Sequence, residues 1–198
     1  PAALDALAPV REGAVAAARD VVAAARAGDV RAALAALGAF RVLCAHRRGA
    51  HGVAVWTARI EGWLGDETGR GPWYPGRPLL VTENDYGLRL YNGDTGVIVD
   101  TGDGRLAAAF ERRGEPVRFA PSRLSAIETV YAMTVHKSQG SQFATAAVLL
   151  PTPTSQILTR ELLYTAVTRA RERLILAGTE ETIRAAIARP VARASGLA

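Results

Sequence analysis

Apolar positions follow two periods along the chain and divide it into three segments. At the start they recur at helical spacing, and Gly28 and Asp29 mark the end of one helix and the cap of the next. A continuous apolar run then predicts a buried strand, and a third helical pattern places Val53, Trp56, Ile60 and Leu64 on one core-facing stripe. The predicted helices span 14–27, 30–37 and 53–64, and the predicted strand spans 40–45. Residues 1–37 form an N-terminal helical segment in this interpretation.

The middle of the chain changes to short strands joined by turns. Residues 65–76 are rich in Gly and Pro and are typical of a linker. Asn92-Gly93 and Asp103-Gly104 are strong hairpin signals beyond it. The predicted strands span 79–82, 88–91, 95–100, 105–111 and 116–119. Their number and length predict a small β-barrel over 76–125.

From residue 127 onward the pattern returns to alternating strands and helices. Thr179 is a predicted N-cap, and Glu180 and Glu181 follow it in the first turn. The predicted strands span 127–133, 144–150 and 174–177, and a helix spans 160–170. The sequence therefore predicts an α/β domain, formed by 38–75 and 126–198, that is interrupted by the β-barrel.

Composition adds limits to this outline. The 198 residues are 49% hydrophobic and 22% charged, which predicts a globular protein with its own core, in one domain or two small ones. No apolar run reaches the length of a membrane span, and the single cysteine, Cys44, is expected to be buried, so we expect a cytoplasmic protein. The first residue is not methionine, which predicts a fragment.

The net charge of +5 permits a nucleic-acid partner without requiring one. Lys137 is the only lysine, and every other cation is arginine. Such a bias fits genome composition as well as selection for phosphate binding. The histidines near residue 50 lack carboxylate or thiol partners at ligand spacing, so no metal site is predicted.

The polar stretch 131–143 is the first candidate site. Hydroxyl, imidazole, ammonium and amide groups lie together between two predicted strands, a combination that suits phosphate oxygens. The polar residues are Thr134, His136, Lys137, Ser138 and Gln139. A connection without any ligand explains the same residues equally well.

A P-loop is absent from the sequence. A Walker A loop needs a lysine preceded by glycine, whereas the only lysine, Lys137, follows His136. The apolar run that ends in Asp100 is better explained as a hairpin strand than as a Walker B motif. On its own the chain is not expected to hydrolyse ATP.

The second candidate site lies in 162–176. On a continuous helix Thr165, Arg169 and Arg173 share one face, although Arg173 already falls beyond the helix predicted for 160–170. A guanidinium held at the end of such a helix suits a transferring phosphoryl group. A basic face paired with Glu161 or Glu172 is the alternative.

Both candidate sites carry a resemblance to one family. The run T-V-H-K-S-Q-G-S-Q-F (134–143), followed by L-L-Y-T-A-V-T-R-A-R (162–171), resembles motifs V and VI of the RecD-like 5′-to-3′ DNA helicases of superfamily 1. Residues 76–99 resemble the segment in which that family inserts an SH3-like barrel, and 40–53 resemble its motif IV region. The resemblance covers about 38–185 and is closest to the exodeoxyribonuclease V alpha subunits.

The resemblance implies a second RecA-like motor domain that lacks the P-loop and carries an SH3-like insertion. Arg169 matches the arginine finger that reaches the γ-phosphate, Arg47 best matches the motif IV arginine with Arg48 as the alternative, and Gly140 and Gln142 fall at the nucleotide. Five residues match positions along the DNA: Asn84, Tyr86, Thr134, His136 and Lys137.

The resemblance also implies ATP with Mg²⁺, held mainly by another motor domain, and single-stranded or duplex DNA as substrate in double-strand-break repair. RecB- and RecC-like subunits are the implied partners if the chain is the exodeoxyribonuclease subunit, and a stand-alone helicase is the nearest variant.

One position departs from the family. Gln142 replaces the usual glutamate, so the contact with the nucleotide ribose carries no charge. A non-catalytic nucleic-acid-binding scaffold therefore remains as an alternative, and a metal-dependent nuclease lacks the acidic cluster that it needs.

Overall fold

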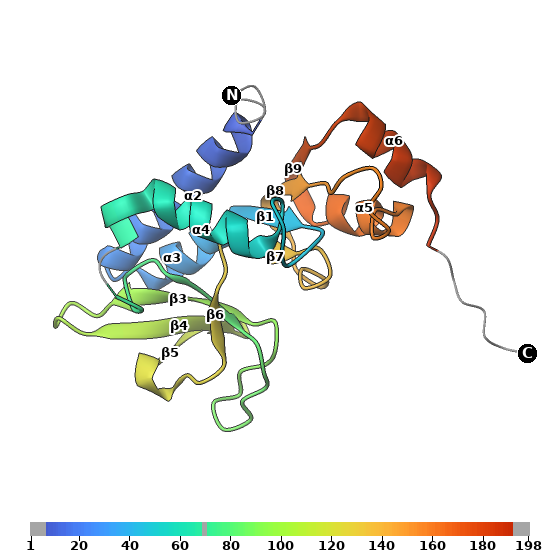
Figure 1. The fold of residues 1–198 in the computed structure, drawn as a ribbon. Coiled ribbons are helices and arrows are strands. Elements are labelled where there is room, and N and C mark those ends of the chain that lie inside the picture. The colour runs from blue at the N-terminus through green and yellow to red at the C-terminus, as the bar shows by residue number, and fades with distance from the viewer. Residues whose placement is uncertain (1–6, 69–70, 192–198) are drawn as a thin grey trace, which may run out of the picture.

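The structure is a computed structural model, and it describes residues 7–68 and 71–191. It contains two β-sheets with helices on their faces (Figure 1). The first sheet is parallel, with the strand order β7-β1-β8-β9. Its strands are β1 (Phe40–Cys44), β7 (Ala132–Thr134), β8 (Phe143–Leu149) and β9 (Ala170–Ala177).

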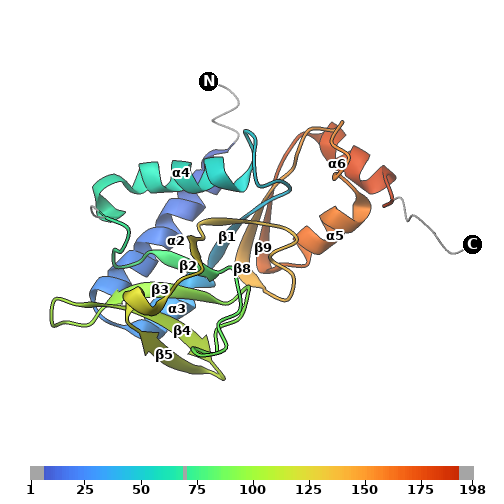
Figure 2. The same ribbon diagram turned by 60° about the horizontal axis from the view of Figure 1, so that its bottom comes forward.

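Helices cover both faces of the parallel sheet. The helices α2 (Ala8–Arg26) and α4 (Val53–Leu64) lie on one face, and α5 (Arg160–Val167) and α6 (Glu180–Ala188) lie on the other (Figure 2). In β1, Val42 and Cys44 pack toward α2 and α4, whereas Leu43 packs toward α5 and α6. A strand buried on both faces is mostly apolar, and β1 fits this rule except at the buried Arg41.

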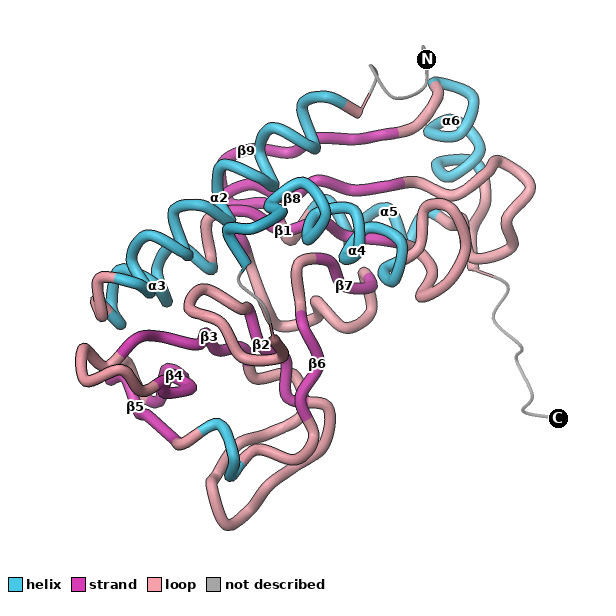
Figure 3. The backbone as a smooth tube through the Cα atoms, turned by 60° about the vertical axis from the view of Figure 1, so that its left-hand side comes forward, coloured by secondary structure: helices cyan, strands magenta, loops and turns pink. Residues whose placement is uncertain are grey.

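The second sheet is antiparallel, with the order β5-β4-β3-β2-β6. Its strands are β2 (Pro78–Val81), β3 (Thr95–Asp100), β4 (Leu106–Arg112), β5 (Glu115–Phe119) and β6 (Ile127–Thr129). The helix α3 (Val30–Leu37) packs on β3 and β4 (Figure 3). Short 3₁₀ helices span Gly65–Thr68 and Pro121–Arg123.

Helix α2 fixes the two sheets relative to each other. Its first half, through Val10, Ala14 and Ala18, packs against the parallel sheet and α4. Its second half, through Val21 and Ala25, packs against β3, β4 and α3. One helix thus contributes to the cores of both sheets, so the relative placement of the sheets depends on it.

Several local predictions are confirmed. The bounds of α3, α4 and β3 are those that the sequence predicts. Asp29 caps α3 by accepting a hydrogen bond from the Ala32 backbone N–H at 3.0 Å, and Thr179 caps α6 in the same way. Both are the short polar residues that satisfy the free N–H groups of a first helical turn.

Two predicted strands are wrong. Residues 127–133 form two strands, because β6 pairs with β2 in the antiparallel sheet whereas β7 pairs with β1 in the parallel sheet. Residues 88–91 form a tight loop with a single bridge between Asp85 and Leu90, and Arg89 within it has a positive φ of 54°. Both errors are tertiary in origin, since the apolar pattern does not say which neighbour a strand pairs with.

The predicted helix 160–170 is also too long. Helix α5 ends at Val167, and β9 begins at Ala170, four residues before the predicted strand.

In the antiparallel sheet, β5 and β6 are edge strands that do not pair with each other, so the order of strands does not close into a barrel. The SH3-like barrel, and with it the division of the chain into a RecA-like domain and an insertion, stays a prediction.

Candidate functional site

The polar loop 135–142 runs from the carboxyl ends of the parallel strands, which form the carboxyl edge of the sheet, to their amino ends, which form the amino edge. It leaves β7 at Thr134, which is aligned with Cys44 at the carboxyl end of β1. It enters β8 at Phe143, near the amino end of β1, where Phe40 is aligned with Thr145. Residues at the two ends of this loop therefore lie at opposite edges of the sheet.

The loop is held by its own hydrogen bonds. The hydroxyl of Thr134 accepts from the Lys137 backbone N–H at 3.2 Å, and the buried hydroxyl of Ser138 donates to the Val135 carbonyl at 2.7 Å. Gly140 has a φ of +85°, in the left-handed region that favours glycine. A folded loop of this kind presents the side chains of His136 and Lys137 outward, where both are at least partly exposed.

Arg169 lies at the amino edge of the sheet, and its guanidinium is fixed by the chain around it. Its Nε donates to the Thr165 carbonyl at 3.0 Å, and its Nη2 donates to the Thr168 hydroxyl at 3.0 Å. Its Nη1 donates to the carbonyls of Ser138, at 3.4 Å, and Ser141, at 3.0 Å. These bonds use four of the five N–H groups of an arginine, which leaves one on Nη2.

Thr165, Arg169 and Arg173 do not share a helical face, because α5 ends at Val167 and Arg173 lies beyond it, which was the open alternative. Thr165 lies on α5, Arg169 follows the helix, and Arg173 lies in β9. What joins Arg169 to Thr165 is instead the hydrogen bond from the guanidinium. The carbonyls of Ser138 and Ser141 hold the same guanidinium, so the structure brings the two candidate sites of the sequence into contact.

Gln142 lies beside Arg169. Its exposed side chain donates from Nε2 to the Thr168 carbonyl at 3.4 Å. Gln142 also lines an open pocket of about 280 Å³ together with Arg41, Thr95 and Glu111. This pocket lies where the parallel sheet meets the antiparallel sheet, and its members are too far apart in sequence for any pattern to have revealed it.

Arg47 and Lys137 lie at the opposite, carboxyl edge and share one partner. Arg47 follows β1, and its Nη2 lies 3.3 Å from Oε1 of Glu128. Lys137 follows β7, and its Nζ lies 3.8 Å from Oε2 of the same carboxylate. Glu128 comes from β6 of the other sheet, and no motif in the sequence pointed to it.

His136 lies on a groove that is separate from the ion pairs of Glu128. With Gln139 it lines an open groove of about 740 Å³ whose other wall comes from the start of α5 and from Arg189. The Arg189 guanidinium is held by the carbonyls of Pro153, at 3.1 Å, and Ser155, at 2.6 Å. Sequence reasoning assigned no role to Arg189.

Asn84 and Tyr86 lie on the loop between β2 and β3. The Asn84 side chain accepts from the Asn92 backbone N–H at 2.9 Å, and Tyr86 is 76% exposed. Tyr91 packs edge to face against Tyr86, with ring centroids 6.4 Å apart. Arg112 donates to the Leu88 carbonyl at 2.6 Å and so ties this loop to β4. Tyr91 is a second exposed aromatic side chain that sequence reasoning missed.

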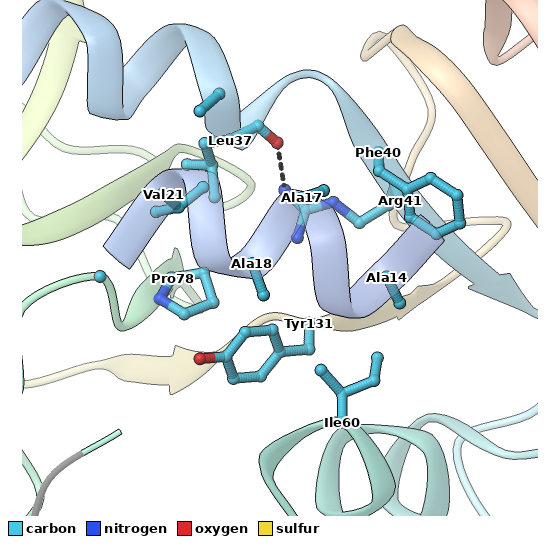
Figure 4. Close-up of a pocket in the computed structure, with 12 residues that line it drawn as sticks. Ala14, Ala17, Ala18, Val21, Leu37, Phe40, Arg41, Ile60, Pro78 and Tyr131 are labelled. Atoms are coloured by element: carbon cyan, nitrogen blue, oxygen red, sulfur yellow. Dashed lines mark hydrogen bonds between the residues drawn. The ribbon is translucent and has the colours of Figure 1, made fainter. Parts of the chain in front are cut away.

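A small cavity between α2, α3, α4 and β1 is excluded as a site (Figure 4). Its volume of about 30 Å³ has room for water but not for a nucleotide. Arg41 borders it with 3% of its surface exposed, and burial lowers the pKa of its guanidinium to about 10. Arg41 donates to the carbonyls of Leu37 and Val130 and lies over the Phe143 ring, so it ties β1 to the end of α3 and to the segment between β6 and β7.

Cys44 is excluded as a nucleophile. It is fully buried in β1, and burial raises the pKa of its thiol to about 12, so the thiolate is absent near neutral pH. We expect Ellman's reagent to label it only when the chain is unfolded by denaturant. Rapid labelling of the folded chain would contradict this burial.

Residues 7–68 and 71–191 contain no group of three or more His, Cys, Asp or Glu side chains placed to hold a metal ion. None of the helices in this part of the chain has both the length and the apolar character to cross a membrane.

Comparison with known proteins gives one consistent group of relatives. The model of the UvrD-like helicase C-terminal domain matches residues 129–177. The RecBCD enzyme subunit RecD of Mycolicibacterium smegmatis is 56% identical over 173 residues, which are 86% of this chain and 30% of that protein. The ATP-dependent RecD2 DNA helicase of Deinococcus radiodurans is 32% identical over 157 residues, 77% of this chain and 22% of that protein. The chain thus spans less than a third of the length of these curated relatives.

Solved structures of Pif1 helicases are more distant. One from Bacteroides, in complex with ADP-AlF₃ and single-stranded DNA, covers 73% of this chain and 42% of its own, with 15% identity and a TM-score of 0.46. Another, of two coordinating Pif1 helicases at forked DNA, covers 90% of this chain and 49% of its own, with 14% identity and a TM-score of 0.45. Both scores are below 0.5, so the relationship rests on the sequence relatives.

Proposed function

We propose that this chain, a C-terminal region of a RecD-like helicase, forms the half of an ATP-driven motor that supplies an arginine finger and part of a single-stranded DNA track. The observation that carries the proposal is the fixed guanidinium of Arg169. An arginine finger acts by placing charge where the transferring phosphoryl group needs it, and a guanidinium that is already held loses little freedom in doing so.

The nucleotide side is the amino edge of the parallel sheet. Arg169 and Gln142 meet there, and the one N–H of Arg169 that has no partner among residues 7–68 and 71–191 is available for a phosphate oxygen. Gly140 gives the loop a backbone conformation that a side chain would strain. ATP and Mg²⁺ themselves are held mainly by the other motor domain, which carries the P-loop, and Gln142 contributes an uncharged hydrogen bond to the ribose.

The DNA side is formed by two groups of residues. Thr134, His136 and Lys137 lie at the carboxyl end of β7, where open α/β sheets usually bind their ligands. Asn84 and Tyr86 lie on the β2–β3 loop, where an exposed tyrosine offers a face for base stacking.

The loop 135–142 connects the two sides. Lys137 near its start faces the carboxyl edge, and Ser141 at its end holds Arg169. A change in the nucleotide state at Arg169 can therefore reach the bound single-stranded DNA through this one short loop. This connection supports coupling of ATP hydrolysis to movement along DNA.

The unwinding polarity tests the proposal as a whole. The longer protein that contains this chain, with RecB- and RecC-like partners present if it needs them, should unwind a duplex that carries a 5′ single-stranded tail. The release of a fluorescently labelled strand after addition of ATP and Mg²⁺ measures unwinding. A duplex with a 3′ single-stranded tail is the control, assayed with the isolated protein. Unwinding from the 3′ tail alone would contradict the RecD-like assignment of polarity.

A non-catalytic scaffold is the second candidate. Gln142 in place of a glutamate favours it, because the nucleotide contact then carries no charge. The scaffold predicts DNA binding that ATP and Arg169 do not influence, and this separates it from the motor.

A further inference from the structure

The carboxyl edge of the parallel sheet brings together three charges from three separate segments. The strands β1 and β7 are parallel neighbours, so the residues that follow them emerge side by side. Arg47 follows one strand, and Lys137 follows the other. Glu128, on β6 of the antiparallel sheet, lies between them and gives one carboxylate oxygen to each, at 3.3 Å and 3.8 Å.

These contacts add little to stability. The side chains of Arg47, Glu128 and Lys137 are 67%, 51% and 33% exposed. Ion pairs at such exposure are screened by water and salt and contribute little to folding. The arrangement is therefore easily opened, and two cations facing one carboxylate leave a surplus positive charge.

We propose that Arg47 and Lys137 together bind one phosphodiester group of single-stranded DNA, and that Glu128 occupies this position until the strand displaces it. The inference rests on the proposed function, since it names a phosphate position within the DNA track. It also moves Arg47 from the nucleotide to the DNA, because Arg47 shares its partner with Lys137 and has none in common with Arg169.

The chemistry of the exchange is balanced. A carboxylate and a phosphodiester each carry a single negative charge and two oxygens that accept hydrogen bonds, so one replaces the other without a change in charge. The guanidinium of Arg47 suits a phosphate, and the ammonium of Lys137 acts as a compact point charge beside it. Glu128 belongs to the antiparallel sheet. Single-stranded DNA that displaces Glu128 therefore also releases a contact between the two sheets.

Replacing Glu128 with glutamine tests the competition. The amide keeps the shape of the side chain but loses the charge, so DNA no longer has to break two ion pairs. We expect Glu128→Gln to tighten binding of a fluorescent oligothymidylate to the 198-residue chain by about 3- to 10-fold at low salt, the range that two exposed ion pairs support. Fluorescence anisotropy at about 50 mM salt measures the change, since phosphate contacts are strongest at low ionic strength.

Glu115→Gln is the matched control. Glu115 is another exposed glutamate in an ion pair, with Arg31, and its replacement changes the net charge of the chain by the same amount. It should leave the affinity nearly unchanged. In a chain that already carries Arg47→Ala and Lys137→Ala, Glu128→Gln should no longer tighten binding, because the two cations it frees are gone.

The salt dependence supplies an independent reading. Loss of one phosphate contact should lower the slope of log affinity against log salt by about 0.7 for single-stranded DNA. Arg47→Ala and Lys137→Ala should each lower it, whereas Arg184→Ala, at an exposed ion pair on α6, should not.

Three outcomes would overturn the inference. Equal tightening by Glu128→Gln and Glu115→Gln would show an effect of net charge alone. No tightening by Glu128→Gln, with binding otherwise intact, would refute the competition while leaving the proposed DNA track in place. Absence of oligothymidylate binding by every variant at low salt would refute both the inference and the DNA track in this chain, without touching the arginine finger.

Discussion

Replacement of Arg169 by alanine should lower DNA-stimulated ATP hydrolysis by about three orders of magnitude, the lower range measured for arginine fingers. Nucleotide binding should persist, because the finger acts on charge that develops in the transition state more than on bound ATP. The measurement compares steady-state turnover and the binding of a fluorescent nucleotide for the longer protein that contains this chain.

Arg169→Lys should be nearly as inactive as Arg169→Ala. A lysine keeps the charge but cannot donate at once to the carbonyls of Thr165 and Ser141 and to the Thr168 hydroxyl. Arg184→Ala, which removes an exposed guanidinium paired with Glu180, is the control and should retain wild-type turnover. Unchanged turnover in Arg169→Ala would reject the finger and favour the scaffold.

Replacement of Trp56 by alanine should have the largest effect on stability. Trp56 is 1% exposed and fills the space between α4 and the parallel sheet, in the cluster that also contains Ile60 and Leu149. Truncation of a buried tryptophan costs about 3–5 kcal/mol. For a chain of this size the melting temperature should fall by about 6–20 °C.

Two control variants test whether the loss of stability comes from the cavity that Trp56→Ala leaves. The Nε1 of Trp56 has no hydrogen-bond partner within the described residues, so Trp56→Phe should cost clearly less than Trp56→Ala. Trp63 lies on the same helix but is only partly buried, so Trp63→Ala should also cost less. Thermal unfolding followed by circular dichroism measures all three, and equal losses would contradict the packing described for α4.

The predicted elements were most accurate where local chemistry decides the structure. Asp29 and Thr179 cap helices because their side chains reach the N–H groups of the next turn. The stripe through Trp56, Ile60 and Leu64 is buried because helical spacing places these residues on one face. The family was also identifiable from the sequence, since motifs V and VI are continuous stretches.

The sequence by itself determined the α/β alternation and the family, and it predicted which residues a helicase motor would use. Only the tertiary structure decided that residues 127–133 change sheets after Thr129, that Arg169 leaves its helix, and that Glu128 reaches Arg47 and Lys137. The physical reason is that strand pairing and ion pairs join residues far apart in the chain. Spacing along the sequence carries no record of which partner each of them meets.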